Sequence, residues 1–123
     1  MLLIFRPKDE AYCTVAKAMV DTVKAAKTGI AQVADRHGYD VSIGFGCHIG
    51  EVIYGNIGTP TRLDFTVMGP AVNLTSRLES LCKPLGATAV FSQSIQKHHP
   101  HLKPAGEHTL KGISSPTPVW VLD

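Results

Sequence analysis

The sequence has few of the residues that mark secreted, metal-binding or nucleic-acid-binding proteins. Its three cysteines, Cys13, Cys47 and Cys82, are odd in number, far apart and without a CxxC pair, so we expect neither a disulfide framework nor a zinc site. Charged residues make up only 18% and the formal net charge is +2. Lys and Arg are scattered along the chain, which argues against nucleic acid or an anionic membrane as a partner.

Long apolar runs are also missing. Met1–Phe5 is too short for a signal-peptide core, and no segment approaches the roughly 20 apolar residues of a membrane-spanning helix. With reduced thiols, this predicts a cytoplasmic protein. No repeat or linker is visible, and residues 1–123 fit a single domain. Hydrophobic residues still make up 44%, which favours an exposed apolar surface such as a subunit interface.

Periodic patterns predict alternating strands and helices. In the first half we expect a short buried strand at Met1–Phe5, a helix from the N-cap Asp9 to Gly38, and a strand at Val41–Ile49 with its partner at Glu51–Ile57. A strand at Leu63–Met68 and a helix opened by Pro70 follow. The rest of the chain predicts a strand at Ala87–Ser92, a short helix or turn at Ser92–His98, and a hairpin of Glu107–Lys111 with Pro118–Leu122. Glycines on one face of the second strand allow another element to approach closely. This order predicts an α+β layer with helices on one side of a mainly antiparallel sheet.

The most informative stretch runs from Asp64 to Glu79, because it brings polar side chains from a strand and a helix to one place. If Pro70 opens the helix, Asn73 and Arg77 lie one turn apart on the same face and can touch one ligand. They flank an apolar stripe, which places them at the rim of the core; the stripe consists of Leu74, Leu78, Leu81 and Leu85. Taken alone, the pair fits a solvated amide and a surface arginine on an ordinary amphipathic helix equally well.

The whole string resembles the strand-turn-helix of the class III adenylate and guanylate cyclase catalytic domain. That motif has an aromatic residue and Thr, then Gly, then Val-Asn-x-x-x-Arg-Leu-Glu, which here ends on Val72–Glu79. The match continues through Gly44–Val52 and Gly55–Gly58, and reaches Leu110-Lys111-Gly112. The resemblance implies a ferredoxin-like βαββαβ sheet with an added C-terminal hairpin.

The same resemblance implies a reaction and gives each residue a role. In the family, the 3′-hydroxyl of a nucleoside triphosphate attacks its own α-phosphate, with two Mg²⁺ or Mn²⁺ ions holding the phosphates. By this resemblance, Arg77 stabilises charge at the α-phosphate, Asn73 orients the ribose, and Lys111 contacts the terminal phosphates. Thr66 stands at the base-reading position and favours ATP over GTP. On composition alone, Thr66 reads as a β-branched strand residue.

Parts of the family domain have no counterpart in this sequence. In the family, both metal-binding aspartates and the adenine-reading lysine lie upstream of the strand that Met1–Phe5 resembles. The chain thus resembles the last two thirds of the domain and lacks the N-terminal strand and helices. We therefore expect it to supply no metal ligand. We also expect its sheet to expose an edge. Truncation is the favoured explanation, ahead of complementation by another chain and of a degenerate domain.

Two functions from different classes follow from the resemblance. Family domains pair head to tail, so the chain would supply the Asn73 and Arg77 side of an adenylate cyclase site to a homodimer or a complementing cyclase chain, and be inactive alone. The alternative is a non-catalytic dimerisation or nucleotide-sensing module. A ferredoxin-like RNA binder is disfavoured because no aromatic stacking pair lies on an exposed strand face.

The histidines are expected to have structural or solvated roles. His48 lies in the glycine-rich strand, where we expect packing or hydrogen bonding rather than catalysis. The four C-terminal histidines favour a solvated loop over a metal site, because they lack helical register and have prolines among them; they are His98, His99, His101 and His108.

Overall fold

The computed structural model describes residues 2–5, 12–38, 42–59 and 62–122, with the backbone alone for residues 54–59 and 62–68. Four strands form one sheet in the order β1 (Phe45–Cys47), β4 (Ala89–Ser92), β6 (Thr117–Val121) and β5 (Lys103–His108). β1 is parallel to β4, and the other neighbours are antiparallel. A C-terminal hairpin forms as predicted, since β5 pairs with β6, but its first strand is Lys103–His108 and not the expected Glu107–Lys111.

Helix α1 (Tyr12–His37) covers one face of this sheet. Its buried residues Ala16, Val20 and Val23 belong to a core cluster with Cys47, Ala89 and Phe91. Gly38 follows the helix with φ 68°, the left-handed conformation that glycine adopts at a helix C′ position. The predicted end of this helix is confirmed, whereas the expected N-cap, Asp9, lies outside the described residues.

Helices α2 (Pro70–Ser80) and α3 (Cys82–Leu85) cover the opposite face. Leu78 and Cys82 pack in a second cluster with Val90, Leu110 and Val119, and the rest of the predicted leucine stripe packs against it. All four residues of β4 are buried, because the strand is covered from both sides. The α+β class is confirmed, but the helices lie on both faces of the sheet and not on one as expected.

The leucine stripe spans two helices rather than one. α2 ends at Ser80, Leu81 forms a turn, and α3 runs to Leu85 before Gly86, which has φ 62°. Pro84 has no N–H to donate to the carbonyl one turn before it, which explains why the first helix does not continue unbroken. The short helix α4 (Gln93–Gln96) follows β4, where a short helix or turn was predicted.

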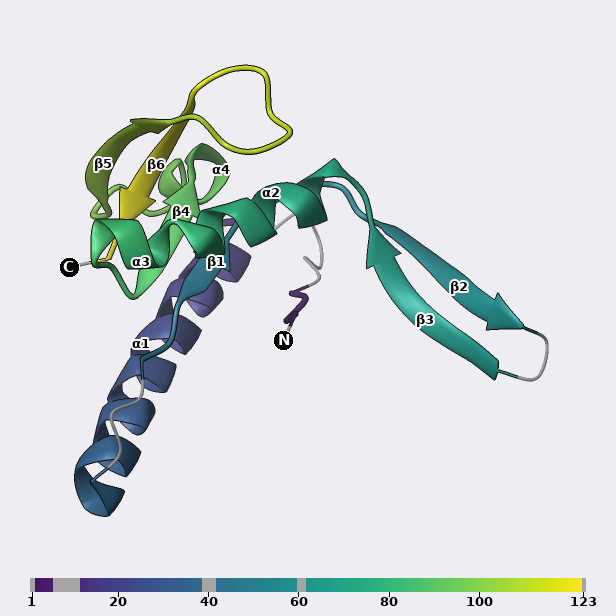
Figure 1. Ribbon diagram of the computed structural model, residues 1–123. Coiled ribbons are helices and arrows are strands. Elements are labelled where there is room, and N and C mark those ends of the chain that lie inside the picture. Colours follow the sequence, from purple (N-terminus) through teal and green to yellow (C-terminus); the bar gives the residue numbers. More distant parts are fainter. Residues whose placement is uncertain (1, 6–11, 39–41, 60–61, 123) are drawn as a thin grey trace.

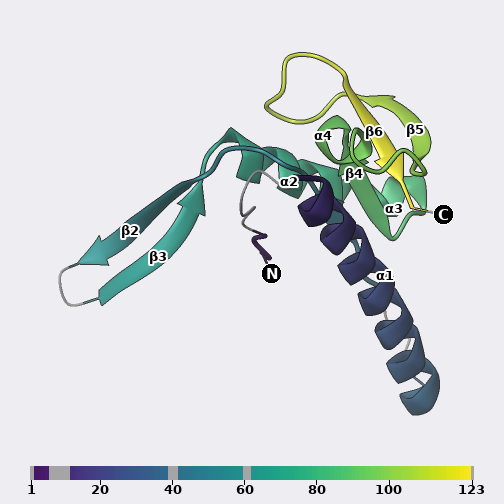
Figure 2. The ribbon, with the colours of Figure 1, turned by 180° about the vertical axis from the view of Figure 1, so that it is seen from behind.

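The hairpin of β2 (Ile53–Thr59) and β3 (Arg62–Met68) is separate from the sheet and projects away from it (Figures 1 and 2). Pairing runs from Ile53 opposite Met68 to Thr59 opposite Arg62. The prediction that Glu51–Ile57 pairs with the strand before it is therefore wrong. A very short connection makes the β2–β3 pairing the least costly in chain entropy.

The N-terminal segment does not form the expected buried strand. Residues 2–5 have no regular secondary structure, and Leu2, Leu3 and Ile4 are 44% to 54% exposed. An apolar segment becomes a strand when another strand satisfies its backbone, and no described strand pairs with this one. No helix among the described residues is long and apolar enough to cross a membrane.

Helix α2 approaches the sheet closely at Gly46. A Cβ built there would overlap the Thr75 carbonyl oxygen and lie 2.6 Å from the Glu79 nitrogen, both of them backbone atoms of α2. Backbone atoms inside a helix cannot move aside as a flexible side chain can. The predicted close approach to the glycine face of this strand is confirmed.

We expect Gly46→Ala to lower the free energy of unfolding by about 3 kcal/mol, because the added methyl group forces α2 off the sheet. Gly29→Ala is the matched control, since its Cβ meets nothing within 4 Å and alanine stabilises a helix interior by up to about 1 kcal/mol. Urea unfolding of both variants measures the difference. Equal stabilities would contradict the packing described here.

Candidate functional site

Asn73 and Arg77 both lie on α2, one turn apart, as the sequence predicts. The helix begins at Pro70, after Gly69 with φ 133°. The Gly69 carbonyl oxygen accepts hydrogen bonds from the Val72 and Asn73 N–H groups at 3.1 and 3.3 Å. Proline suits this first position because its missing N–H would have no partner there.

The two side chains differ in exposure. Asn73 is exposed and Arg77 is half-buried, next to the fully buried Leu78. No acidic side chain in the described part of the chain pairs with Arg77. A guanidinium suits a planar anionic group, such as a phosphate or carboxylate.

The other two predicted residues lie on different elements. Thr66 pairs with Gly55 in the β2–β3 hairpin through its backbone, and its side chain is not among those described. Lys111 is exposed in the connection from β5 to β6. Its neighbour Leu110 is buried in the same cluster as Leu78, so Lys111 and Arg77 each adjoin a residue of one core cluster.

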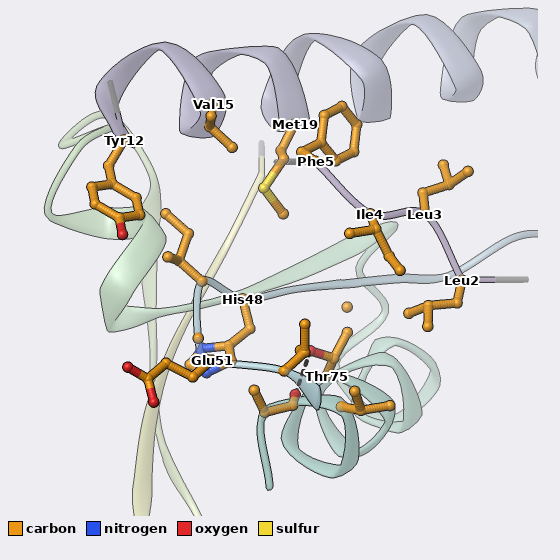
Figure 3. Close-up of a pocket in the computed structure, with 16 residues that line it drawn as sticks. Leu2, Leu3, Ile4, Phe5, Tyr12, Val15, Met19, His48, Glu51 and Thr75 are labelled. Carbon is orange, nitrogen blue, oxygen red and sulfur yellow. Dashed lines mark hydrogen bonds between the residues drawn. The ribbon is translucent and has the colours of Figure 1, made fainter. Parts of the chain in front are cut away.

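Sequence reasoning missed a cavity of about 390 Å³ between α1, α2, β1 and the N-terminal segment (Figure 3). Its walls are mostly apolar, and none of Asn73, Arg77 and Lys111 lines it. Gly46 of β1 does line it. Among the described strands β1 pairs with β4 alone, so the expected exposed sheet edge lies beside this cavity. Two features of the sequence lie in the walls of this cavity, the glycine face of β1 and the apolar N-terminal segment. Neither of them alone indicates a cavity.

His48 has the hydrogen-bonding role that the sequence predicts. Its Nδ1 lies 2.7 Å from the Ser92 hydroxyl and 3.1 Å from the Ser94 hydroxyl, and the two hydroxyls are 2.7 Å apart. The Ser94 Oγ also accepts the Ile49 N–H at 3.0 Å. Burial lowers the pKa of His48 below its usual 6.5, because a desolvated imidazolium is unfavourable.

The C-terminal histidines do not gather into one site. His98 Nδ1 lies 3.0 Å from Cys13 Sγ, while His108 Nε2 donates to the Ala105 carbonyl at 2.8 Å. Both rings are half-buried, as is that of His99, so the expectation of a solvated loop holds only for His101, which is exposed. No group of three or more His, Cys, Asp or Glu residues in the described part of the chain could hold a metal ion.

The three cysteines are free. Cys13 is exposed, whereas Cys47 and Cys82 are buried. Burial, with a smaller contribution from nearby Cys82, raises the pKa of Cys47 to about 12. Such a thiol stays protonated at neutral pH and has a packing role.

Comparison with known proteins points to one family. The family model described as adenylate and guanylate cyclase catalytic domain matches residues 4–122. An adenylate cyclase of Anabaena cylindrica is 34% identical over 77 residues, which cover 63% of this chain and 14% of that protein.

Solved structures agree with this match. The adenylyl cyclase CyaB of P. aeruginosa superposes with a TM-score of 0.71 at 25% identity, covering 95% of this chain and 63% of that one. The guanylyl cyclase Cya2 gives a TM-score of 0.66 at 25% identity, covering 93% and 58%. The chain therefore spans less than two thirds of each of these solved chains and a small part of the Anabaena protein.

We expect the free energy of unfolding to fall as the pH drops below about 6.5, with a contribution from His48. The unfolded chain then binds a proton at this residue while the folded chain, whose His48 pKa is lowered, does not. Above pH 6.5 both forms are neutral and the contribution vanishes. Urea unfolding from pH 5 to 8, with His48→Gln alongside, measures it. Identical pH profiles for the two proteins would contradict the prediction.

Proposed function

Because this chain belongs to the adenylate and guanylate cyclase catalytic domain family, we propose that it supplies one half of an adenylate cyclase site. The site converts ATP to cyclic AMP and pyrophosphate at an interface with a second chain, in the cytoplasm. The observation that carries the proposal is the position of Asn73 and Arg77 one turn apart on α2, with no acidic partner for Arg77 among the described residues.

The chemistry assigned to these two residues follows from where charge develops. When the 3′-hydroxyl attacks the α-phosphate, negative charge builds on the phosphate oxygens. The fixed guanidinium fork of Arg77 can donate two parallel hydrogen bonds to them, which a lysine cannot do. Asn73 has both a donor and an acceptor, which suits the ribose oxygens.

Two further residues are proposed to bind the nucleotide. Lys111 is exposed and has the compact charge that suits the terminal phosphates. Thr66 is proposed to contact the base and to favour adenine. Its strand, β3, joins α2 through Gly69.

The hairpin supports the proposal of a second chain. A two-stranded hairpin is marginally stable alone in water, yet this one projects away from the core (Figure 1). A partner that covers it would also cover Ile53, which lies at its base and is 63% exposed. We propose a homodimer or a complementing cyclase chain as that partner.

The divalent cations of the family do not fit the described residues of this chain. Mg²⁺ and Mn²⁺ require several oxygen ligands, and the described residues hold no acidic cluster that could provide them. The described residues therefore offer no metal site, and we propose that the chain does not cyclise ATP by itself. The same observation favours a second candidate, a non-catalytic dimerisation or nucleotide-sensing module.

We expect mixing to separate the two candidates. The partner is a cyclase chain that retains its metal-binding aspartates but carries alanine in place of its own transition-state arginine. Cyclic AMP formation should appear when this chain is added and fall about 10² to 10³-fold with Arg77→Ala. Arg36→Ala, at an exposed position near the end of α1, is the matched control and should leave the rate unchanged.

Two outcomes would count against the half-site. Robust cyclic AMP production by the isolated chain with Mg²⁺ or Mn²⁺ would show that no partner is needed. Association with the partner that is unaffected by Arg77→Ala and gives no cyclic AMP would favour the non-catalytic module.

In the same mixture, we expect Lys111→Ala to raise the KM for ATP about tenfold with a smaller change in kcat, because a contact to the terminal phosphates binds the ground state as well as the transition state. Lys97→Ala, also exposed, provides the control. A loss confined to kcat would contradict a role in binding the terminal phosphates.

A further inference from the structure

The base of the β2–β3 hairpin is held at two points. The outgoing leg leaves β1 through His48, Ile49 and Gly50, and the returning leg enters α2 through Gly69. The legs are in contact at Gly69, where an added Cβ would lie 3.6 Å from the Glu51 carbonyl oxygen. The direction of the hairpin therefore depends on what fixes residues 48–52.

The outgoing leg is tied to β4 and α4 by a chain of hydrogen bonds in which each group can donate to the next. The Ile49 N–H donates to Ser94 Oγ at 3.0 Å. The Ser94 hydroxyl can then donate to Ser92 Oγ, and the Ser92 hydroxyl to Nδ1 of a neutral His48, each across 2.7 Å. Ser92 is only 4% exposed, so water cannot easily replace these partners.

The ring of His48 is also confined on its other side. A Cβ at Gly50 would lie 2.8 Å from His48 Nε2 and 2.7 Å from the Ala71 side chain. The ring thus fills the space between the two serines and the leg itself.

We propose that Ile49, Ser94, Ser92 and His48 form a proton-operated latch, which fixes the hairpin base while His48 is neutral and releases it when His48 is protonated. A proton on Nδ1 turns it from an acceptor into a donor, to Ser92 or to Ser94, which lie 2.7 and 3.1 Å away. One of the two serine hydroxyls is then left without an acceptor among these four groups, and losing that hydrogen bond weakens the tie to Ile49.

The surroundings of the ring favour release on protonation. Two titratable described side chains, Glu51 in the leg and Tyr12 on α1, line the cavity with His48 (Figure 3). The elements α2 and α4 contribute uncharged groups, Ala71 and Ser94. Glu51 is exposed, so an imidazolium gains an anionic neighbour by turning toward the solvent and away from the serines.

Ser92 has a second use for its hydroxyl when the latch opens. It occupies the N-cap position of α4, yet makes no side-chain capping hydrogen bond. Serine at this position normally accepts a backbone N–H. Release from His48 allows Ser92 to take up that role, which gives the open state a hydrogen bond of its own.

The latch rests on hydrogen bonds within this chain and does not depend on the proposed function. The consequence of the latch for catalysis does rest on the proposed function, because a hairpin that changes direction would alter contact with the proposed partner. The test therefore uses the isolated 123-residue chain and no cyclase assay.

NMR of the isolated chain from pH 4.5 to 7.5 tests the latch. Ring nitrogen shifts of His48 report its tautomer and protonation, and amide exchange of Ile49, corrected for intrinsic pH dependence, reports the tie to Ser94. We expect Ile49 exchange to rise about tenfold or more as His48 titrates. Amides of β2 and β3 should gain independent motion in ¹⁵N relaxation, while Val119 in the core stays protected.

Variants separate the latch from general loosening. Ser94→Ala should speed Ile49 exchange across the whole pH range and abolish its pH dependence, with Val119 unchanged. Ser80→Ala removes an exposed hydroxyl bonded to the Ser76 carbonyl and should behave like the unmodified chain. The proposal is overturned if Ile49 exchange does not follow the His48 titration, or if Ser94→Ala leaves hairpin motion unchanged. Loss of Val119 protection together with that of Ile49 would mean global unfolding and would equally overturn it.

Discussion

The close approach of α2 to β1 at Gly46 is the constraint on which most of this structure depends. With hydrogen as its side chain, Gly46 admits the helix backbone at Thr75 and Glu79. The helix is then held on the sheet by Leu78, which packs in the cluster that includes Val90 and Val119. Contacts between backbone and backbone leave little freedom for sliding or rotation, so the position of α2 fixes everything attached to it.

Two consequences for the candidate site follow from this packing. The buried leucine stripe determines which face of α2 is turned toward the sheet. Asn73 and Arg77 flank this stripe, so they lie at the edge of the buried face and not within it. The start of α2 is also the end of the hairpin, since β3 ends at Met68 and α2 begins at Pro70. Any displacement of the hairpin base therefore also moves the first turn of α2, the helix that carries Asn73.

The sequence was sufficient where local chemistry decides the structure. Pro70 set the start of α2, Gly38 set the end of α1, and the leucine stripe identified the buried face. The pair of Asn73 and Arg77 followed from spacing along a helix, which depends on no distant residue. The roles given to the pair came from the resemblance to a family and not from its geometry.

Sequence reasoning failed where a strand had to choose its partner. The residues after β1 pair with β3 and not with β1, and Leu2–Phe5 remain unpaired despite their apolar composition. Pairing depends on which edges are free in the folded chain, which period-two patterns do not encode. The serine partners of His48 are likewise more than 40 residues away, so nothing near His48 in the sequence indicated them.

Four exposed apolar residues of this chain lie in two regions near the candidate site. Leu2, Leu3 and Ile4 line the cavity beside β1, which is the edge strand of the sheet in the described part of the chain. Ile53 lies at the base of the hairpin. An edge strand presents unpaired N–H and C=O groups. Apolar side chains beside it are removed from water only when another surface covers them. Both regions border the elements that carry or position the candidate site, α2 and the hairpin. A second polypeptide that covered both regions would bury apolar surface. It would also restrict the motion of α2 and the hairpin, which the candidate site requires in fixed positions. Partner binding and ordering of the site would therefore be coupled.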